Sequence, residues 1–132
     1  MARNDLLDVF KMRLTEAGLT EVFTTMPDGR THPEATVVAF GLPQRNVVDF
    51  SGTEEETLRV TTIVKRISEA KAMEDITEAE HIIRTSSMES QNGSYELVKV
   101  ETDPPQAIPW DESGRFVWAF DSYITTTRKD FF

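Results

Sequence analysis

The sequence predicts an α+β fold, with a mostly antiparallel sheet of four to five strands and two helices packed on one face. Three features favour this class. Two segments place apolar residues at helical spacing, several others alternate apolar and polar residues as strands do, and the strands come in runs instead of alternating strictly with helices. A length of 132 residues with 39% hydrophobic residues suits one globular core, so residues 1–132 are expected to form a single domain.

The first helix is expected from Asn4 to Ala17. Apolar residues recur along it every three or four positions and form one face. Asn4 suits the N-cap position, and Gly18 suits the left-handed residue that follows a helix. The second helix is expected over Glu69–Thr85, with Ser68 as its N-cap and a similar apolar face.

The second helix carries a signal that would interrupt it. Thr77 and Glu80 have the spacing of a capping box, a motif found at helix starts, so a break or kink near Asp75 is an alternative to one continuous helix. The apolar residues keep their helical spacing across this point, which favours the continuous helix. They are Ala72, Ile76, Ala79 and Ile83.

The first part of the sheet is expected to hold two or three strands. The extended segments Glu21–Met26 and Ala35–Phe40 flank a Pro-Asp-Gly turn sequence at 27–29, and are predicted to form a hairpin with a long connection. The next stretch, Gly41–Glu56, contains turn residues and three consecutive glutamates. It is predicted to be mainly loop, with a short strand at Asn46–Phe50.

The remaining strands are expected over Leu58–Ile67, Tyr95–Glu101 and Arg115–Arg128. The first alternates apolar and polar residues and so buries one face. Leu58, Val60, Thr62 and Val64 share that face, whereas Arg59, Thr61 and Lys65 share the other, with Ile63 as an exception. The second ends before the two prolines at 104–105, because proline cannot join a strand ladder. In the third, four large apolar residues share the face that is expected to enter the core. They are Phe116, Trp118, Phe120 and Ile124.

The residue types that carry most enzyme chemistry are scarce or badly spaced. The chain has no cysteine, which excludes disulfides, thiolate catalysis and cysteine-ligated zinc. Its two histidines, His32 and His81, are not accompanied by the three or four ligands that a metal site needs. No glycine-rich nucleotide loop or serine nucleophile motif occurs either. No catalytic residue, metal site or cofactor is therefore predicted.

The chain is acidic, with 23 Asp and Glu against 14 Lys and Arg and a net charge of −9. Such a surface repels the phosphate backbone, so no specific nucleic-acid binding is expected. No apolar run approaches the roughly 18 residues that a membrane helix needs, and the first residues lack the apolar centre of a signal peptide. The sequence therefore predicts no membrane partner and favours a cytoplasmic location.

Three aromatic residues outside the expected core are candidates for contacts with other proteins. Trp110 follows a proline in a loop, a position that suits an interface anchor. Phe131 and Phe132 are the last two residues of the sequence and are expected either to dock on a neighbouring molecule or to fray.

The end of the sequence combines two prolines at 104–105, an Asp-Glu-Ser-Gly turn at 111–114 and a final aromatic strand. Before it come an N-terminal helix, a strand that carries Lys65 and Arg66, and the helix around 72–83. This series of elements, in a short acidic chain, resembles the minor capsid and tail-terminator (tail-completion) proteins of long-tailed bacteriophages and prophages.

The resemblance implies an α+β subunit that assembles with itself into a ring, as a hexamer, at the head-proximal end of the tail. Such a ring would stop growth of the tail tube and join it to head-completion proteins, while DNA passes through an acidic lumen. The protein would then be a non-enzymatic part of the virion, or lie in the host bacterial cytoplasm when expressed from a prophage. The expected loop Phe40–Glu56 is a candidate contact with the tube or the neighbouring subunit.

Two other functions fit the same residues. A small-ligand-binding or enzymatic α+β domain would hold one deep pocket between sheet and helices, and would be a monomer or dimer. A bacterial protein-interaction module is the second alternative. A ring-forming protein differs from both because it exposes apolar edges and sediments as a defined oligomer.

Overall fold

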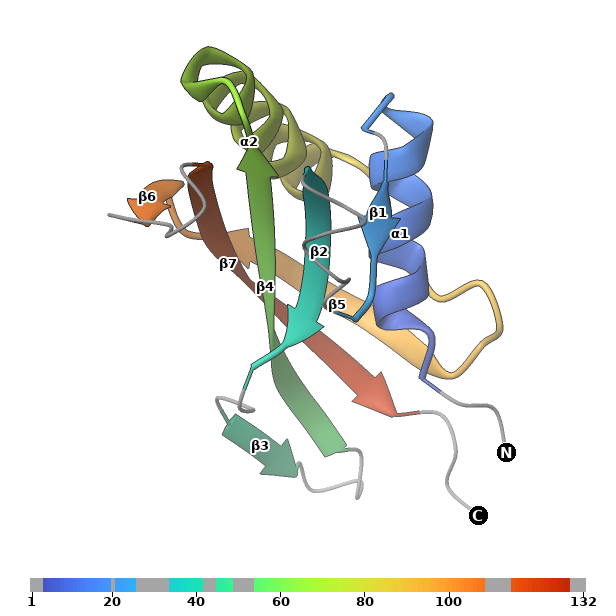
Figure 1. The fold of residues 1–132 in the computed structure, drawn as a ribbon. Helices are drawn as coiled ribbons and strands as arrows, with labels where there is room; N and C mark the ends of the chain where they lie inside the picture. The colour runs from blue at the N-terminus through green and yellow to red at the C-terminus, as the bar shows by residue number, and fades with distance from the viewer. Residues whose placement is uncertain are drawn as a thin grey trace.

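The computed structural model of the chain (Figure 1) describes residues 4–19, 21–25, 34–41, 45–48, 54–108 and 115–128. Two helices and seven strands form in these ranges, and the seven strands belong to one sheet. In chain order they are α1 (Leu6–Glu16), β1 (Val22–Phe23), β2 (Ala35–Phe40), β3 (Arg45–Val48), β4 (Glu54–Arg66), α2 (Glu69–Thr85), β5 (Tyr95–Thr102), β6 (Gln106–Ile108) and β7 (Phe116–Arg128). The α+β class predicted from the sequence is confirmed.

The two longest strands, β4 and β7, lie at the centre of the sheet. The main path runs β1-β2-β4-β7-β5, with β3 paired to β4 and β6 paired to β7. β4 and β7 are antiparallel, and their pairing extends from Glu55 opposite Thr127 to Arg66 opposite Phe116. Among the described strands, only β1 and β2 pair in parallel.

The parallel pairing of β1 and β2 contradicts the predicted hairpin. Val22 lies opposite Thr36 and Phe23 opposite Val37, with both strands running the same way. A tight turn would have produced an antiparallel pair, whereas a parallel pair requires the chain to return to the level where the first strand began. The predicted turn at 27–29 lies outside the described residues.

The stretch expected to be mainly loop contributes two strand segments. β3 spans Arg45–Val48, close to the short strand predicted there, and β4 begins at Glu54, ahead of its predicted start at Leu58. β3 pairs with the first residues of β4 on one side and β7 pairs with most of them on the other. Ladder hydrogen bonds therefore hold the glutamates of β4 in extended backbone, which outweighs their low strand propensity.

The core lies between the sheet and the two helices. Even-numbered side chains of β4 and β7 face the helices and pack with apolar residues of α1 and α2. The buried members of this cluster include Phe10, Val60, Val64, Ile76, Ile83, Phe120 and Ile124. Burying apolar surface of this kind is the main driving force of folding.

The predicted aromatic face of β7 is only partly buried. Phe120 and Ile124 are inside the core, and Trp118 packs against it while remaining half-buried. Phe116 is 41% exposed, so its predicted place in the core is wrong. It is the first residue of β7 and lies opposite Arg66, the last residue of β4, so it sits at the end of the sheet beyond the packed layer.

The N-cap of α1 lies one residue later than predicted. The N-cap residue is Asp5, not Asn4, although Asn4 Oδ1 accepts a hydrogen bond of 2.9 Å from the backbone N of Leu6. The carboxylate of Asp5 does not cap its own helix. It accepts hydrogen bonds from Ser90 Oγ and from the backbone N of Gln91, both at 2.8 Å, and so ties α1 to the segment that precedes β5.

The end of α1 follows the prediction for Gly18. This residue has a φ of +98°, a left-handed conformation that glycine adopts without steric cost. The backbone N of Gly18 donates to the carbonyl of Thr15, and that of Leu19 donates to Leu14, each at 3.1 Å. These two bonds form the Schellman arrangement that satisfies the last carbonyls of a helix.

α2 is one unbroken helix over the predicted residues Glu69–Thr85. Ser68 is its N-cap, and its hydroxyl accepts a hydrogen bond from the backbone N of Lys71. The capping-box signal at Thr77 and Glu80 does not interrupt it, because the apolar face on both sides of Asp75 is continuously buried against the sheet. The continuous alternative is therefore confirmed.

Candidate functional site

The sheet has one face that the helices do not cover. Both helices lie on the same side of the sheet (Figure 1), so the odd-numbered side chains of β4 and β7 form an open face on the other side. Across these strands, Arg59 lies opposite Tyr123 and Thr61 lies opposite Asp121. The alternation of the two strands therefore gathers charged and hydroxyl groups at the middle of the open face.

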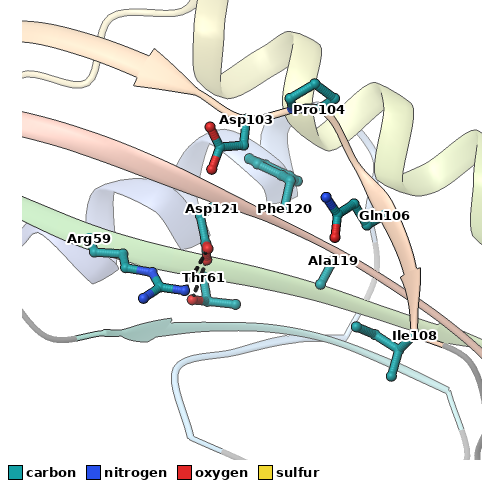
Figure 2. A pocket seen from close by; sticks show the side chains of 9 residues that line it. All are labelled: Arg59, Thr61, Asp103, Pro104, Gln106, Ile108, Ala119, Phe120 and Asp121. Atoms are coloured by element: carbon teal, nitrogen blue, oxygen red, sulfur yellow. Dashed lines mark hydrogen bonds and ion pairs between the residues drawn. The ribbon is translucent and has the colours of Figure 1, made fainter.

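Asp121 is the centre of this polar group. Arg59 Nη2 lies 2.7 Å from Asp121 Oδ2, and Thr61 Oγ1 donates to Asp121 Oδ1 at 2.7 Å (Figure 2). Burial alone would raise the pKa of Asp121, but the hydrogen bonds from Arg59 and Thr61 together outweigh it and the pKa falls below its ordinary value. The same contact raises the pKa of Arg59, mainly through the hydrogen bond to Asp121 and to a lesser extent through the negative charge of Asp121. Both groups are held in their charged forms.

A second carboxylate lies next to this pair, at the end of β5. The hydroxyl of Tyr123 donates to Asp103 Oδ2 at 2.9 Å, and the backbone N of Asp103 donates to the carbonyl of Asp121 at 2.9 Å. The hydrogen bond to Asp103 is the main reason why the pKa of Tyr123 is raised, and burial adds to it. Asp103 is therefore positioned by both its backbone and its side chain.

The prolines that follow Asp103 shape a hollow in the open face. They separate β5 from β6, and β6 pairs again with the same edge of β7, placing Ile108 opposite Val117. The hollow between β6 and the Arg59–Asp121 pair measures about 250 Å³ (Figure 2). Its lining mixes charged and apolar groups, namely Arg59, Thr61, Asp103, Pro104, Gln106, Ile108, Ala119, Phe120 and Asp121.

This hollow suits a contact with another macromolecule better than it suits catalysis. Both oxygens of Asp121 accept hydrogen bonds and its pKa is lowered, whereas a general base at neutral pH needs a raised pKa. Its volume falls below the range of ordinary ligand pockets, which begins at about 300 Å³. Within the described residues, no three His, Asp or Glu side chains approach closely enough to hold a metal ion.

A second hollow lies between α1 and the far end of β2. It measures about 320 Å³ and is lined by Asn4, Leu7, Asp8, Thr24 and Phe40. Phe40 is 46% exposed, which is unusual for a large aromatic side chain at the end of an otherwise buried strand. An exposed apolar group beside a hollow marks this place as a second candidate for contact with another chain.

The structure leaves the predicted interface residues untested. Trp110, Phe131 and Phe132 lie outside the described residues, and so does His32. His81 lies exposed on α2, where its backbone carbonyl accepts a hydrogen bond from the hydroxyl of Thr85.

The Arg59–Asp121 pair is the feature that the sequence did not reveal. Alternation already placed Arg59 and Thr61 together on the polar side of their strand. Local alternation does not determine the pairing register with β7, a strand that begins many residues later, so it does not assign Asp121 to the same group.

In the described part of the chain, neither helix has the length and hydrophobicity that crossing a bilayer requires. No curated protein matches the sequence. Among solved structures, a chain in the virion of a native gene transfer agent particle has a similar fold. It superimposes with a TM-score of 0.62 at 13% sequence identity, covering 92% of this chain and 94% of that chain. At this identity the likeness concerns the fold alone.

A match to a protein-family model shows which family the chain belongs to. The model of the bacteriophage tail terminator protein matches residues 6–128, a range that begins with α1 and ends with the last residue of β7. The match takes in both helices and the seven described strands. The resemblance read from the order of elements is confirmed: the chain belongs to the bacteriophage tail terminator family and is a structural protein of the phage tail.

Proposed function

We propose that this protein is the subunit of a six-membered ring that caps the tail tube and joins it to head-completion proteins. The observation that carries the proposal is the tail-terminator match over residues 6–128, which leaves no described element outside it. The ring, the number of copies and the two partners come from the function of the family as the sequence resemblance implies it. In this role the whole chain acts as one domain, without catalysis or a cofactor.

The proposal places the protein in the virion, or in the host bacterial cytoplasm when it is expressed from a prophage. The fold shared with a chain of a gene transfer agent virion supports the first location, because that chain is part of an assembled particle. The net charge of −9 suits a ring around a DNA channel, since an acidic wall does not hold the passing phosphate backbone.

The segment formed by β3 and the start of β4 is the proposed contact with the tail tube. Most of it lies within the range expected to be a loop, Phe40–Glu56, and in Figure 1 it is on the side of the sheet away from α2. The pairing of Val48 with Glu54 and of Arg45 with Thr57 gives it a defined register, and β7 pairs with the same part of β4 on the other side. An ordered segment loses less conformational entropy on binding than a loop would.

Growth of tail tubes in vitro tests this function. Tail-tube protein from the same phage is polymerised with and without this chain, and tube lengths are measured by electron microscopy. The wild-type chain should stop elongation and appear as a cap at one end. Tubes of unchanged length, with no density at either end, would contradict the proposal.

A pair of matched variants addresses the proposed tube contact. Glu55→Lys changes an exposed residue at the start of β4, and Glu101→Lys makes the same change on the exposed face of β5. The first should weaken capping and the second should leave it intact, with unchanged circular dichroism spectra in both. Equal effects of the two variants would contradict a tube contact at this segment. The capping function itself is tested separately by the tube-growth assay.

A further inference from the structure

One end of the sheet exposes three large apolar side chains. Ile67, Ile108 and Phe116 are 62%, 45% and 41% exposed. Phe116 lies opposite Arg66, the residue before Ile67, and Ile108 lies opposite Val117, the residue after Phe116. Phe116 follows the even-numbered, helix-side alternation of β7, whereas Ile108 shares the open face with Val117. Ile67 and Phe116 therefore lie together where β4 ends and β7 begins (Figure 1). We call Ile67 and Phe116 the apolar end.

The hollow beside α1 lies at the opposite end of β2. We call it the α1 hollow; its apolar residues are Leu7 and Phe40. β2 begins at Ala35, which pairs with Lys65 near the apolar end, and finishes at Phe40. Its six residues separate the two surfaces by roughly 17 Å along the strand, at about 3.3 Å per residue. The two surfaces therefore cannot meet within one molecule.

The two surfaces are complementary in size and in charge. The apolar end projects side chains of the size of isoleucine and phenylalanine, and a hollow of about 320 Å³ is large enough to receive one of them. Lys65 and Arg115 flank the apolar end in the sequence, whereas the described residues that line the α1 hollow include Asp8 and no cation. The acidic neighbour of the apolar end, Glu34, already accepts a hydrogen bond from the backbone N of Ile67.

We propose that the apolar end of one copy docks into the α1 hollow of the next copy, and that this head-to-tail contact builds the assembly. The occupant of each surface is thus a second copy of this chain. A contact between two unlike surfaces at opposite ends of a subunit is heterologous, and it closes into a ring when the rotation between copies is right. The inference rests on the proposed function, in which the chain forms a ring, and it names the surfaces that form it.

Single substitutions at each surface test the contact by sedimentation velocity over a concentration series. Ile67→Asp changes the apolar end, Phe40→Asp changes the α1 hollow, and Val98→Asp is the matched control because Val98 is 50% exposed on β5. Wild type and the control should assemble alike. Each of the two surface variants should weaken assembly at least about 30-fold, as for loss of an interface hot spot. A variant that assembles like wild type would overturn the proposal, and so would wild-type protein that stays monomeric at millimolar concentration.

Mixing the two surface variants distinguishes a head-to-tail contact from a symmetric one. Ile67→Asp retains an intact α1 hollow, and Phe40→Asp retains an intact apolar end. An equimolar mixture should therefore form a dimer that cannot grow, although each variant alone is monomeric. A mixture that remains monomeric, or that assembles beyond the dimer, contradicts the proposed pair of surfaces.

Cysteine cross-linking supplies a readout that does not depend on the aspartate variants folding. The chain has no cysteine of its own, so a double variant, Ile67→Cys with Phe40→Cys, gives a clean background. Oxidation should join successive copies into a ladder on a denaturing gel, whereas Ile67→Cys with Val98→Cys should not. If the wild-type chain caps tubes but the oxidised Ile67→Cys, Phe40→Cys variant forms no ladder, this contact is contradicted and the proposed function is not. If the ladder forms but the wild-type chain does not cap tubes, the proposed function is contradicted and the contact is not.

Discussion

The guanidinium of Arg66 lies 2.8 Å from the carboxylate of Asp75, measured from Nε to Oδ2, and both side chains are buried. The same guanidinium donates from Nη1 to the carbonyl of Ala35 and from Nη2 to the hydroxyl of Thr36, each at 2.9 Å. One side chain at the end of β4 therefore joins β4, β2 and α2. Its position at the level of the apolar end ties the stability of the subunit to the surface proposed for assembly.

Removing one partner of this pair should be costly. Arg66→Met leaves the carboxylate of Asp75 buried without its main partner, and should lower the free energy of unfolding by about 3–5 kcal/mol. Lys71→Ala is the control, because Lys71 contacts the other oxygen of Asp75 at 3.2 Å but is exposed; it should cost under about 1 kcal/mol. Urea denaturation measures both, and equal losses would show that burial of the pair does not matter.

A double substitution separates the value of the pair from the penalty of breaking it. Arg66→Met with Asp75→Leu removes both charges and fills the space with apolar atoms. It should recover much of the stability lost in Arg66→Met, because replacing a whole buried ion pair is often neutral or stabilising. A double variant as unstable as the single one would mean that the bonds to β2 dominate.

The pKa of Asp121 predicts an acid-sensitive open face. This pKa lies below its ordinary value of 3.8 in the folded chain, because the hydrogen bonds from Arg59 and Thr61 outweigh the effect of burial. A carboxyl group whose pKa is lower in the folded than in the unfolded chain stabilises the fold at pH values above the unfolded pKa. This stabilisation is lost as the pH falls through the folded pKa. Stability should therefore decline below pH ~4, and the decline should be shallower in Asp121→Asn. Urea midpoints at several pH values measure this, and parallel profiles would contradict it.

The two large aromatic residues in the middle of β7 should differ in their effect on stability. Phe120 is buried in the core, so Phe120→Ala should cost about 3–5 kcal/mol. Trp118 only packs against that core and is half-buried, so Trp118→Ala should cost less, although tryptophan is the larger residue. Thermal and urea unfolding of both variants decide this. A larger loss for Trp118 would mean that the end of the sheet is more tightly packed than its exposure indicates.

Local signals in the sequence predicted the helices well. The bounds of α2 follow from Ser68 as the cap and from apolar residues at helical spacing, and the end of α1 follows from the conformational freedom of Gly18. Each of these features is decided by residues within one or two turns of each other. The same holds for the alternation that placed Arg59 and Thr61 on the polar face of β4.

Features that depend on distant residues were not predictable in this way. The parallel pairing of β1 with β2 depends on the path of the intervening chain, and the group around Asp121 depends on the register between β4 and β7. The glutamates at the start of β4 become a strand because β3 and β7 flank them, not because of their own propensity. The two hollows likewise combine residues from elements that are far apart in sequence.

The acidic surface predicts weak binding to DNA, which also bears on the proposed channel. With a net charge of −9, the affinity for duplex DNA near physiological salt should be no tighter than the non-specific range of about 10⁻⁴–10⁻⁶ M. Fluorescence anisotropy with a labelled duplex measures this. As a control, Glu74→Lys with Glu78→Lys reverses two exposed charges of α2 and should tighten binding in low salt. A sub-micromolar, salt-sensitive complex of the wild-type chain would contradict an acidic channel that lets DNA pass without holding it.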